Sequence, residues 1–225
     1  DNEGEGFLLD SWPIGYGYSR GISHNAQMRY NISERDGKKL SGAIAIFGGV
    51  APAVIYNNTI YYEADRLAGS PMFQGEGAPF TSSIWGKSGK PILHVYNNIF
   101  ITKKARTDAV SNNVWSDGAG TFNFDNNIWW RVEGGFRAQW GTKVITSWRG
   151  WQAKGFDPHG LNTDPLLVGP LGEGPLAYNL QPRSPAINRA RVVTEALRGM
   201  GLQDAFGVPT PQGGAYDIGA AEYAP

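Results

Sequence analysis

The chain has 225 residues, and its 20 Lys and Arg residues balance its 20 Asp and Glu residues, so the formal net charge is zero. A balanced charge removes the electrostatic attraction that dominates binding to nucleic acid and to anionic membranes, so we expect neither partner. The apolar runs are far shorter than the ~20 residues of a membrane-spanning helix, and the length fits one domain, which we place at residues 1–225.

Short apolar segments recur along the chain, and several of them follow an asparagine theme. In chain order they are residues 6–9, Tyr30-Asn31-Ile32, residues 42–47, Tyr56-Asn57-Asn58-Thr59-Ile60, Ser83-Ile84-Trp85, Tyr96-Asn97-Asn98-Ile99-Phe100, a weaker copy at residues 111–115, and Asp125-Asn126-Asn127-Ile128-Trp129. Runs of four or five β-forming residues bounded by Gly, Asn and Asp predict strands, and none shows the period of a helix.

The spacing of this theme predicts how the strands are arranged. Asn31, Asn58, Asn98 and Asn127 follow one another in steps of 27, 40 and 29 residues, and the long step contains a Gly- and Pro-rich stretch at residues 67–79 that we interpret as an inserted loop. Short strands at such a period favour a coil of stacked parallel strands. Asn suits its corners because it tolerates the left-handed conformation, and stacked Asn side chains can form hydrogen bonds. The alternative is a β-sandwich in which Asn-Asn marks hairpin turns.

From Trp148 onward this theme gives way to three other motifs. They are Asp164-Pro165-Leu166-Leu167, the stretch Tyr178–Asn188 and the stretch Asp217–Tyr223. In this order they strongly resemble the C-terminal segment of secreted bacterial right-handed parallel β-helix proteins.

This resemblance implies an all-β fold, a right-handed parallel β-helix (solenoid) with an irregular C-terminal closing segment. The rungs would occupy residues 1–147, and residues 148–225 would fold back to close the last rung. The resemblance also implies a secreted, extracellular protein. It leaves the activity open, because lyases, hydrolases, epimerases and binding modules share the scaffold. We expect a helical turn only at Thr194–Gly199.

Aromatic residues are the candidates for ligand binding. Neighbouring positions of a strand face opposite sides, so within Tyr61-Tyr62 and Trp129-Trp130 one ring of each pair should point outward. A flat outward ring is a platform for a sugar, and a row of rings would follow a polysaccharide. The predicted substrate-binding residues are Trp12, Tyr16, Tyr18, Tyr62, Trp85, Trp115, Trp130 and Trp140. The alternative is that inward rings fill the core and outward rings pack under loops.

Carboxylates near the start of the chain are the candidates for catalysis. Glycoside hydrolysis uses two carboxylates about 5–5.5 Å or 6.5–9.5 Å apart, and neighbouring strands lie ~4.8 Å apart, so stacking can supply the short separation. If the protein is an enzyme, we expect these residues to be Glu3, Glu5, Asp10 and Asp36. Asp1, Glu3 and Glu5 also suit a calcium ion, or they form an ordinary solvated corner. We expect no other cofactor.

Three functions remain open. The first is a non-catalytic carbohydrate-binding module, similar to the β-helical xylan-binding modules attached to bacterial plant-cell-wall hydrolases, with a polysaccharide as partner and a fused catalytic domain in the parent protein. The second is a β-helix glycoside hydrolase or, less favoured, a polysaccharide lyase. The third is a structural or adhesive solenoid. We favour the first, because the aromatic content and the balanced charge suit a neutral glycan.

Overall fold

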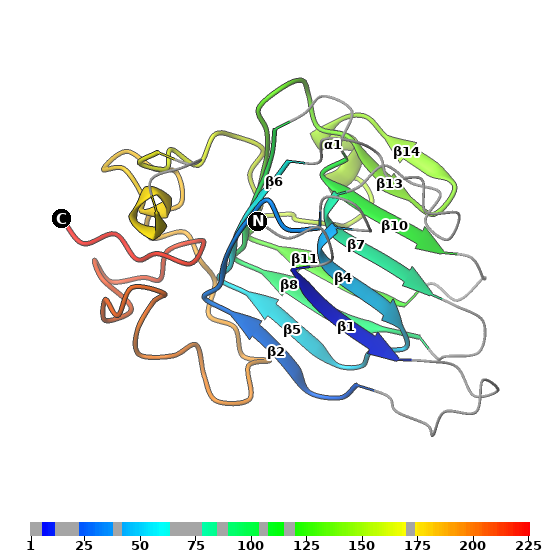
Figure 1. Cartoon of the computed structure of the whole chain (residues 1–225), viewed down its shortest axis with the longest axis horizontal. Coiled ribbons are helices and arrows are strands. Elements are labelled where there is room, and N and C mark those ends of the chain that lie inside the picture. The colour runs from blue at the N-terminus through cyan, green and yellow to red at the C-terminus, as the bar shows by residue number, and fades with distance from the viewer. Residues whose placement is uncertain are drawn as a thin grey trace.

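A computed structural model of the chain describes residues 6–11, 23–37, 42–63, 78–84, 90–103, 108–114, 120–169 and 174–225. Nearly all its regular structure is β (Figure 1). The strands are β1 (Phe7–Ser11), β2 (Ala26–Arg29), β3 (Ile32–Glu34), β4 (Gly42–Gly48), β5 (Ala53–Tyr56), β6 (Thr59–Tyr62), β7 (Ala78–Ile84), β8 (Ile92–Tyr96), β9 (Ile99–Thr102), β10 (Val110–Val114), β11 (Thr121–Asp125), β12 (Ile128–Arg131), β13 (Ala138–Trp140) and β14 (Lys143–Ile145). The described part of the chain has no helix that is long and apolar enough to cross a membrane.

Three sheets collect every third strand. Sheet A has the order β1-β4-β7-β10-β13-β14, sheet B the order β11-β8-β5-β2, and sheet C the order β12-β9-β6-β3. We call each run of three strands that visits sheets A, B and C in turn a pass, so β1–β3 form the first. All the paired strands are parallel except β13 and β14, which are antiparallel. Figure 1 shows β1, β4, β7 and β10 side by side as successive layers.

The register confirms the asparagine spacing read from the sequence. Ile32 pairs with Thr59, Thr59 with Ile99, and Ile99 with Ile128, so the residue before each of them is an Asn of the predicted series. Parallel pairing of these strands rules out the hairpins of the β-sandwich alternative. The proposed inserted loop falls mostly on residues 64–77, which lie outside the described residues, and its last two residues begin β7.

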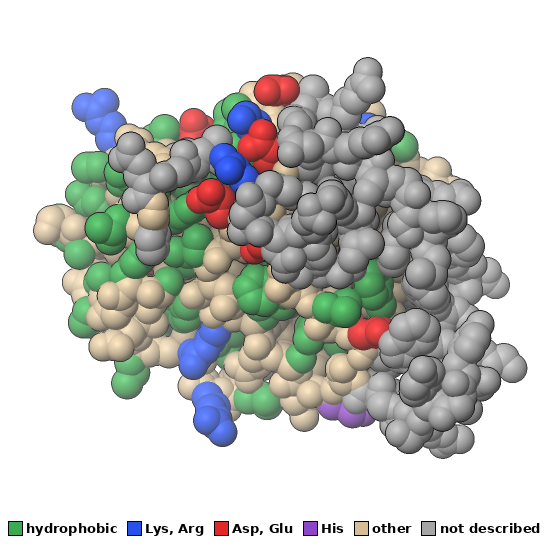
Figure 2. All heavy atoms as spheres, viewed as in Figure 1, with side chains coloured by type: hydrophobic (Ala, Val, Ile, Leu, Met, Phe, Trp, Pro, Cys, Tyr) green, Lys and Arg blue, Asp and Glu red, His purple; other side chains and the backbone are tan. Residues whose placement is uncertain are grey.

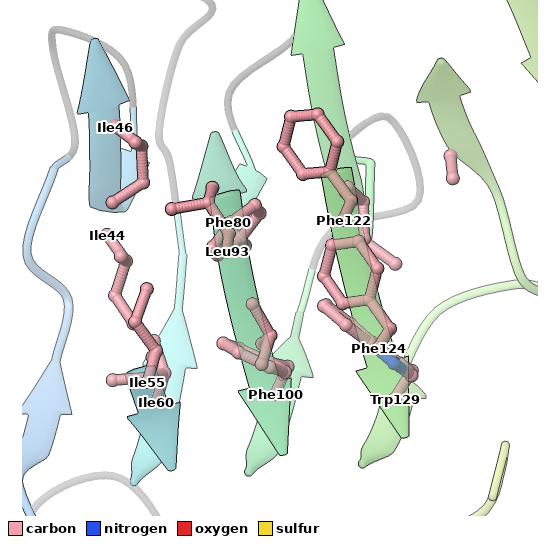
Figure 3. Packing of buried hydrophobic residues seen from close by; sticks show 14 of the residues in the cluster. Ile44, Ile46, Ile55, Ile60, Phe80, Leu93, Phe100, Phe122, Phe124 and Trp129 are labelled. Atoms are coloured by element: carbon pink, nitrogen blue, oxygen red, sulfur yellow. The ribbon is translucent and has the colours of Figure 1, made fainter. Parts of the chain in front are cut away.

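Inward side chains of the three sheets meet in one apolar core. Ile60, Phe100 and Trp129 occupy equivalent positions of β6, β9 and β12, and the Phe100 and Trp129 rings stack with their centroids 4.1 Å apart. Figure 3 shows such stacks running through the interior. Each buried large side chain contributes about 1.5–3 kcal/mol, so the stacks supply much of the stabilisation.

Two successive asparagines build the corner between sheets B and C. The first of each pair, Asn57, Asn97 or Asn126, has the left-handed backbone (φ 51°, 56° and 53°) that the sequence predicted for a corner. The second continues a ladder: Asn58 Nδ2 donates to Asn98 Oδ1 at 2.9 Å, and Asn98 Nδ2 donates to the next Asn at 3.0 Å. The corner is therefore held by side chains as well as by the sheet hydrogen bonds.

Residues 148–161 pack on the last pass. Helix α1 (Trp148–Gln152) begins after Ser147, whose Oγ accepts a hydrogen bond from Gly150 N at 3.1 Å. It places Trp151, which is fully buried, against the core. The prediction of a helical turn at residues 194–199 and no other helix is wrong: this stretch forms turns, and the helical segments of the described residues are α1 and the 3-10 helix η1 (Pro175–Tyr178).

The rest of the C-terminal segment covers the outer faces of two sheets. Leu167, Leu180 and Ile218 pack on the outward apolar side chains of sheet C, and Val193 and Met200 pack on those of sheet B. Figure 1 shows this segment, coloured yellow to red, along one flank of the sheets. It therefore buries side chains that alternation alone would leave exposed.

Candidate functional site

Five of the predicted sugar-binding aromatics, Trp12, Tyr16, Tyr18, Trp85 and Trp115, lie outside the described residues. The other three, Tyr62, Trp130 and Trp140, can be located.

Tyr62 is a core residue. It is 1% exposed, and its hydroxyl donates to Gly37 O at 3.2 Å. Its neighbour Tyr61 faces outward but is 2% exposed, because the C-terminal segment covers it. The prediction that one ring of this pair is presented to a ligand is therefore wrong.

Trp140 and Trp130 are both half-buried. Trp140 packs against the core, with its ring centroid 4.6 Å from that of Phe156, so the prediction that it forms an outward platform is wrong. Trp130 lies on the outer face of sheet C against the cluster that includes Leu167. Among the described residues no Phe, Tyr or Trp side chain is fully exposed.

The described acids of the predicted catalytic group lie far apart. Asp36 accepts a hydrogen bond from Ser33 Oγ at 2.7 Å and lies beside Gly6, because a Cβ on Gly6 would be 2.8 Å from Asp36 Cβ. Asp10 follows Gly6 by four residues, which in a strand is ~13 Å. The structure therefore places Asp36 beside the residue that precedes β1 and Asp10 near the end of that strand, so it does not bring these two of the four catalytic candidates together.

Asp1, Glu3 and Glu5, the predicted calcium ligands and remaining catalytic candidates, lie outside the described residues. Within the described ranges no three His, Asp or Glu side chains come together as a metal site.

The sequence did not predict a polar cluster on the outer face of sheet B. His94 and Tyr96 face outward from β8, and His94 Nδ1 lies 3.0 Å from the Tyr96 hydroxyl. That hydroxyl donates to Glu195 Oε1 at 3.3 Å, and the guanidinium carbon of Arg191 lies 4.2 Å from the centre of the Tyr96 ring. Asn123 Nδ2, from β11, is 3.3 Å from His94 Nδ1. Residues 191–195 are far from β8 in the sequence and approach it only in the folded chain. No local sequence pattern could therefore predict this cluster.

Burial determines the protonation of this cluster. Burial lowers the pKa of His94, against the Glu195 charge, and burial raises the pKa of Tyr96 to about 12. Burial also acts to raise the pKa of Glu195. A hydrogen bond from the Glu195 backbone N–H and the positive charge of Arg191 outweigh the effect of burial and hold this pKa below its ordinary value. Near pH 7 the cluster therefore offers a neutral imidazole, a phenol and a carboxylate. Such a set can form hydrogen bonds to hydroxyl groups, and a cavity of about 100 Å³ lies beside it, lined by His94 and Glu195 among others.

The ends of the sheet A strands are level. Ser11 of β1 pairs with Gly48 of β4, and Ile84 of β7 pairs with Val114 of β10. Phe47 pairs with Ser83, so the residues that follow them, Gly48 and Ile84, are also aligned. In the sequence, a tryptophan follows three of the four aligned positions: Trp12 after Ser11, Trp85 after Ile84, and Trp115 after Val114. The sequence alone did not show this alignment, because the asparagine spacing does not fix the register of sheet A.

Comparisons of the chain with protein-family models, with curated proteins and with solved structures found no match in any of the three.

Proposed function

We propose that the chain is a right-handed parallel β-helix that binds a plant-cell-wall polysaccharide of the xylan type without cleaving it. Four passes visit sheets A, B and C in the same order, and parallel crossover connections are right-handed in nearly all proteins. We also propose that the protein is secreted, as the β-helix proteins that its C-terminal motifs resemble are, and that it is joined to a catalytic domain in its parent chain.

The level ends of the sheet A strands carry this proposal. Adjacent strands lie ~4.8 Å apart, so the aligned positions Ser11, Ile84 and Val114 span ~14 Å along the stack. Each is followed by a tryptophan in the sequence. A linear set of aromatic rings is what binding an extended polysaccharide needs, and we propose that the glycan uses the three tryptophans that follow these aligned positions.

Two further observations support the proposal. Asp10 and Asp36, the two described catalytic candidates, lie toward opposite ends of β1 rather than side by side. In one region of the face drawn in Figure 2, acidic and basic side chains of the described residues lie near one another. Glu63, for example, lies 3.0 Å from Lys103 and 3.7 Å from Arg35. A surface of this kind suits a polymer whose backbone is uncharged.

Affinity gel electrophoresis and calorimetry on xylan, pectin and β-glucan test the proposal. We expect xylan to bind, and we expect Trp12→Ala, Trp85→Ala and Trp115→Ala together to weaken binding at least tenfold. Trp148→Ala, a half-buried tryptophan elsewhere, is the control. Circular dichroism should show that every variant is folded.

The same incubations should be assayed for products. New reducing ends would overturn the non-catalytic proposal in favour of a β-helix glycoside hydrolase, and unsaturated products would favour a lyase. Failure of every glycan to bind would favour a structural or adhesive solenoid. Binding that survives the triple substitution would show that the glycan does not use this edge.

A further inference from the structure

A groove of about 670 Å³ lies where residues 198–203 pass the end of β2. Its lining consists of Arg29, Tyr30, Arg198, Gly201, Leu202 and Gln203. Small-ligand sites typically measure about 300–1,000 Å³, so a sugar residue fits this volume. Among the described residues, the lining offers two guanidinium groups, one amide, one aromatic ring and the 85% exposed Leu202, and none of these lining residues has a carboxylate.

The Arg29 side chain is fixed in place. Its Nη1 donates to Met200 O at 3.0 Å, and its charge lowers the pKa of Tyr56 against the larger, opposite effect of burial. Gly201 has φ +102°, which side chains other than glycine rarely adopt, and a Cβ there would lie 2.6 Å from Arg29 Nη1. A guanidinium has five N–H donors, so one bond to a carbonyl leaves others for a ligand. Because the group is already ordered, binding costs little conformational entropy.

Tyr30 departs from the pattern of the other passes. It has φ 52° at the corner position where the next three passes place Asn57, Asn97 and Asn126. Those asparagines bind backbone carbonyls of the C-terminal segment, for instance Asn97 Nδ2 to Arg191 O at 2.9 Å. The Tyr30 ring instead lines the groove and meets Tyr56 edge-on, with the centroids 6.4 Å apart. A bulky side chain in the left-handed region costs about 1–2 kcal/mol, and such strain is typical of functional sites.

We propose that this groove binds an anionic sugar residue of the polysaccharide, whose carboxylate or sulfate group pairs with Arg29 and Arg198. Planar guanidinium groups match such oxyanions by paired hydrogen bonds, and the Tyr30 ring offers an apolar face to the sugar. Glu222, whose charge acts on Tyr30, accepts hydrogen bonds from the backbone N–H groups of Gln212 and Asp217 and is not part of the lining. The inference rests on the proposed function, since it names a substituent of the same glycan.

The test compares charged and neutral glycans on the full chain. Calorimetry uses glucuronate-substituted xylan, the same xylan with its uronate groups reduced, and dextran sulfate. Arg198→Ala removes an exposed guanidinium, Tyr30→Asn installs the residue of the other passes, and Arg183→Ala removes an exposed arginine outside the groove. We expect Arg198→Ala and Tyr30→Asn to weaken binding of charged xylan at least fivefold, with no change for reduced xylan or in Arg183→Ala. If the groove variants bind only dextran sulfate more weakly, the groove is assigned to sulfate groups. If they bind only charged xylan more weakly, it is assigned to carboxylate groups.

Three results would overturn the inference. Wild-type affinity of both groove variants for charged xylan and for dextran sulfate would reject the groove while leaving glycan binding intact. An equal loss in Arg183→Ala would show a net-charge effect only. Failure of the wild-type chain to bind any glycan would reject the proposed function together with this inference. An NMR titration with free glucuronate tests the groove separately from polymer binding: a ligand there should shift the Gly201 and Gln203 amide resonances, and unshifted resonances would also reject the groove.

Discussion

Asp157 ends the asparagine ladder by accepting both N–H groups of Asn127. Its Oδ1 lies 3.2 Å from the Asn127 backbone N and 2.8 Å from Asn127 Nδ2. Each ladder residue donates toward the next pass, so the last position needs acceptors and no donor, which a carboxylate provides. The other oxygen, Oδ2, accepts the indole N–H groups of Trp129 and Trp151, both at 2.9 Å. One buried carboxylate thus joins the corner, the core and helix α1.

Replacing Asp157 with Asn should destabilise the fold although the two side chains have nearly the same shape. Whichever way the amide is turned, its NH₂ group meets N–H donors, either those of Asn127 or those of the two indoles. An unsatisfied buried group costs about 1–3 kcal/mol, and two donors are affected on either side, so we expect a loss of about 2–4 kcal/mol. Urea unfolding measures it. Glu133→Gln, at an exposed position, is the control, and an unchanged midpoint for Asp157→Asn would contradict the assigned role.

The stability of the chain should depend on pH through its buried carboxyl groups. Burial raises the pKa of Asp157 to about 6 and that of Glu222 to about 7. Both groups bind a proton more tightly in the folded chain, so their stabilising contribution is fully present below their unfolded pKa of about 4 and is lost as the pH rises through 6 and 7. We expect the free energy of unfolding from these groups to fall between about pH 4 and pH 7.

The measurement is the difference between the wild-type chain and Glu222→Gln in denaturant titrations across that range. The variant should be less stable at low pH, because Glu222 accepts from Gln212 N and Asp217 N with separate oxygens, but its stability should fall less as the pH rises. His94, whose pKa burial lowers, acts in the opposite direction but is present in both proteins and cancels. Parallel curves for the two proteins would show that Glu222 does not titrate in this way.

The ladder should be more sensitive at its centre than at its first described member. Asn98 Oδ1 accepts two N–H groups of Asn58 at 3.0 and 2.9 Å, and its Nδ2 donates to Ile55 O and Tyr96 O, both at 2.9 Å. Asn98 is fully buried, whereas Asn31 is half-buried, so water can replace its partners. We expect Asn98→Ala to cost about 3 kcal/mol or more and Asn31→Ala about 1 kcal/mol. Equal losses in urea unfolding would show that the ladder has no buried centre.

The sequence predicted the features that local chemistry sets. The asparagine theme located the corners, and its steps gave the register of sheet C residue by residue, because each Asn is required at the same place in every pass. Burial of outward side chains could not be predicted in this way. Tyr61 faces outward as alternation requires, yet Ile218, far away in the sequence, belongs to the cluster that covers it. Residue 157 is an Asp, so it does not match the asparagine theme, and it lies beyond the last strand. Its place in the ladder is seen only in the folded chain.

Gly219 should be essential for docking the C-terminal segment on sheet C. Its N–H donates to Asn97 O at 2.8 Å, and the next N–H, of Ala220, donates to Thr59 Oγ1 at 2.9 Å. A Cβ on Gly219 would lie 2.6 Å from Ile99 Cδ1 and 2.9 Å from Thr59 Oγ1, and its φ is +101°.

The matched control is Gly214→Ala, because Gly214 has nearly the same φ, +97°, with no atom within 4 Å of the Cβ position. Both substitutions bear the backbone cost, about 1 kcal/mol, so their difference reports the crowding alone. We expect Gly219→Ala to lose a further 1–3 kcal/mol or so, as overpacked sites do, and to release residues 174–225 to limited proteolysis while Gly214→Ala stays resistant. If the two variants unfold and digest alike, the contact between Gly219 and Ile99 does not hold the segment in place, and docking must depend on the asparagine side chains of the corner.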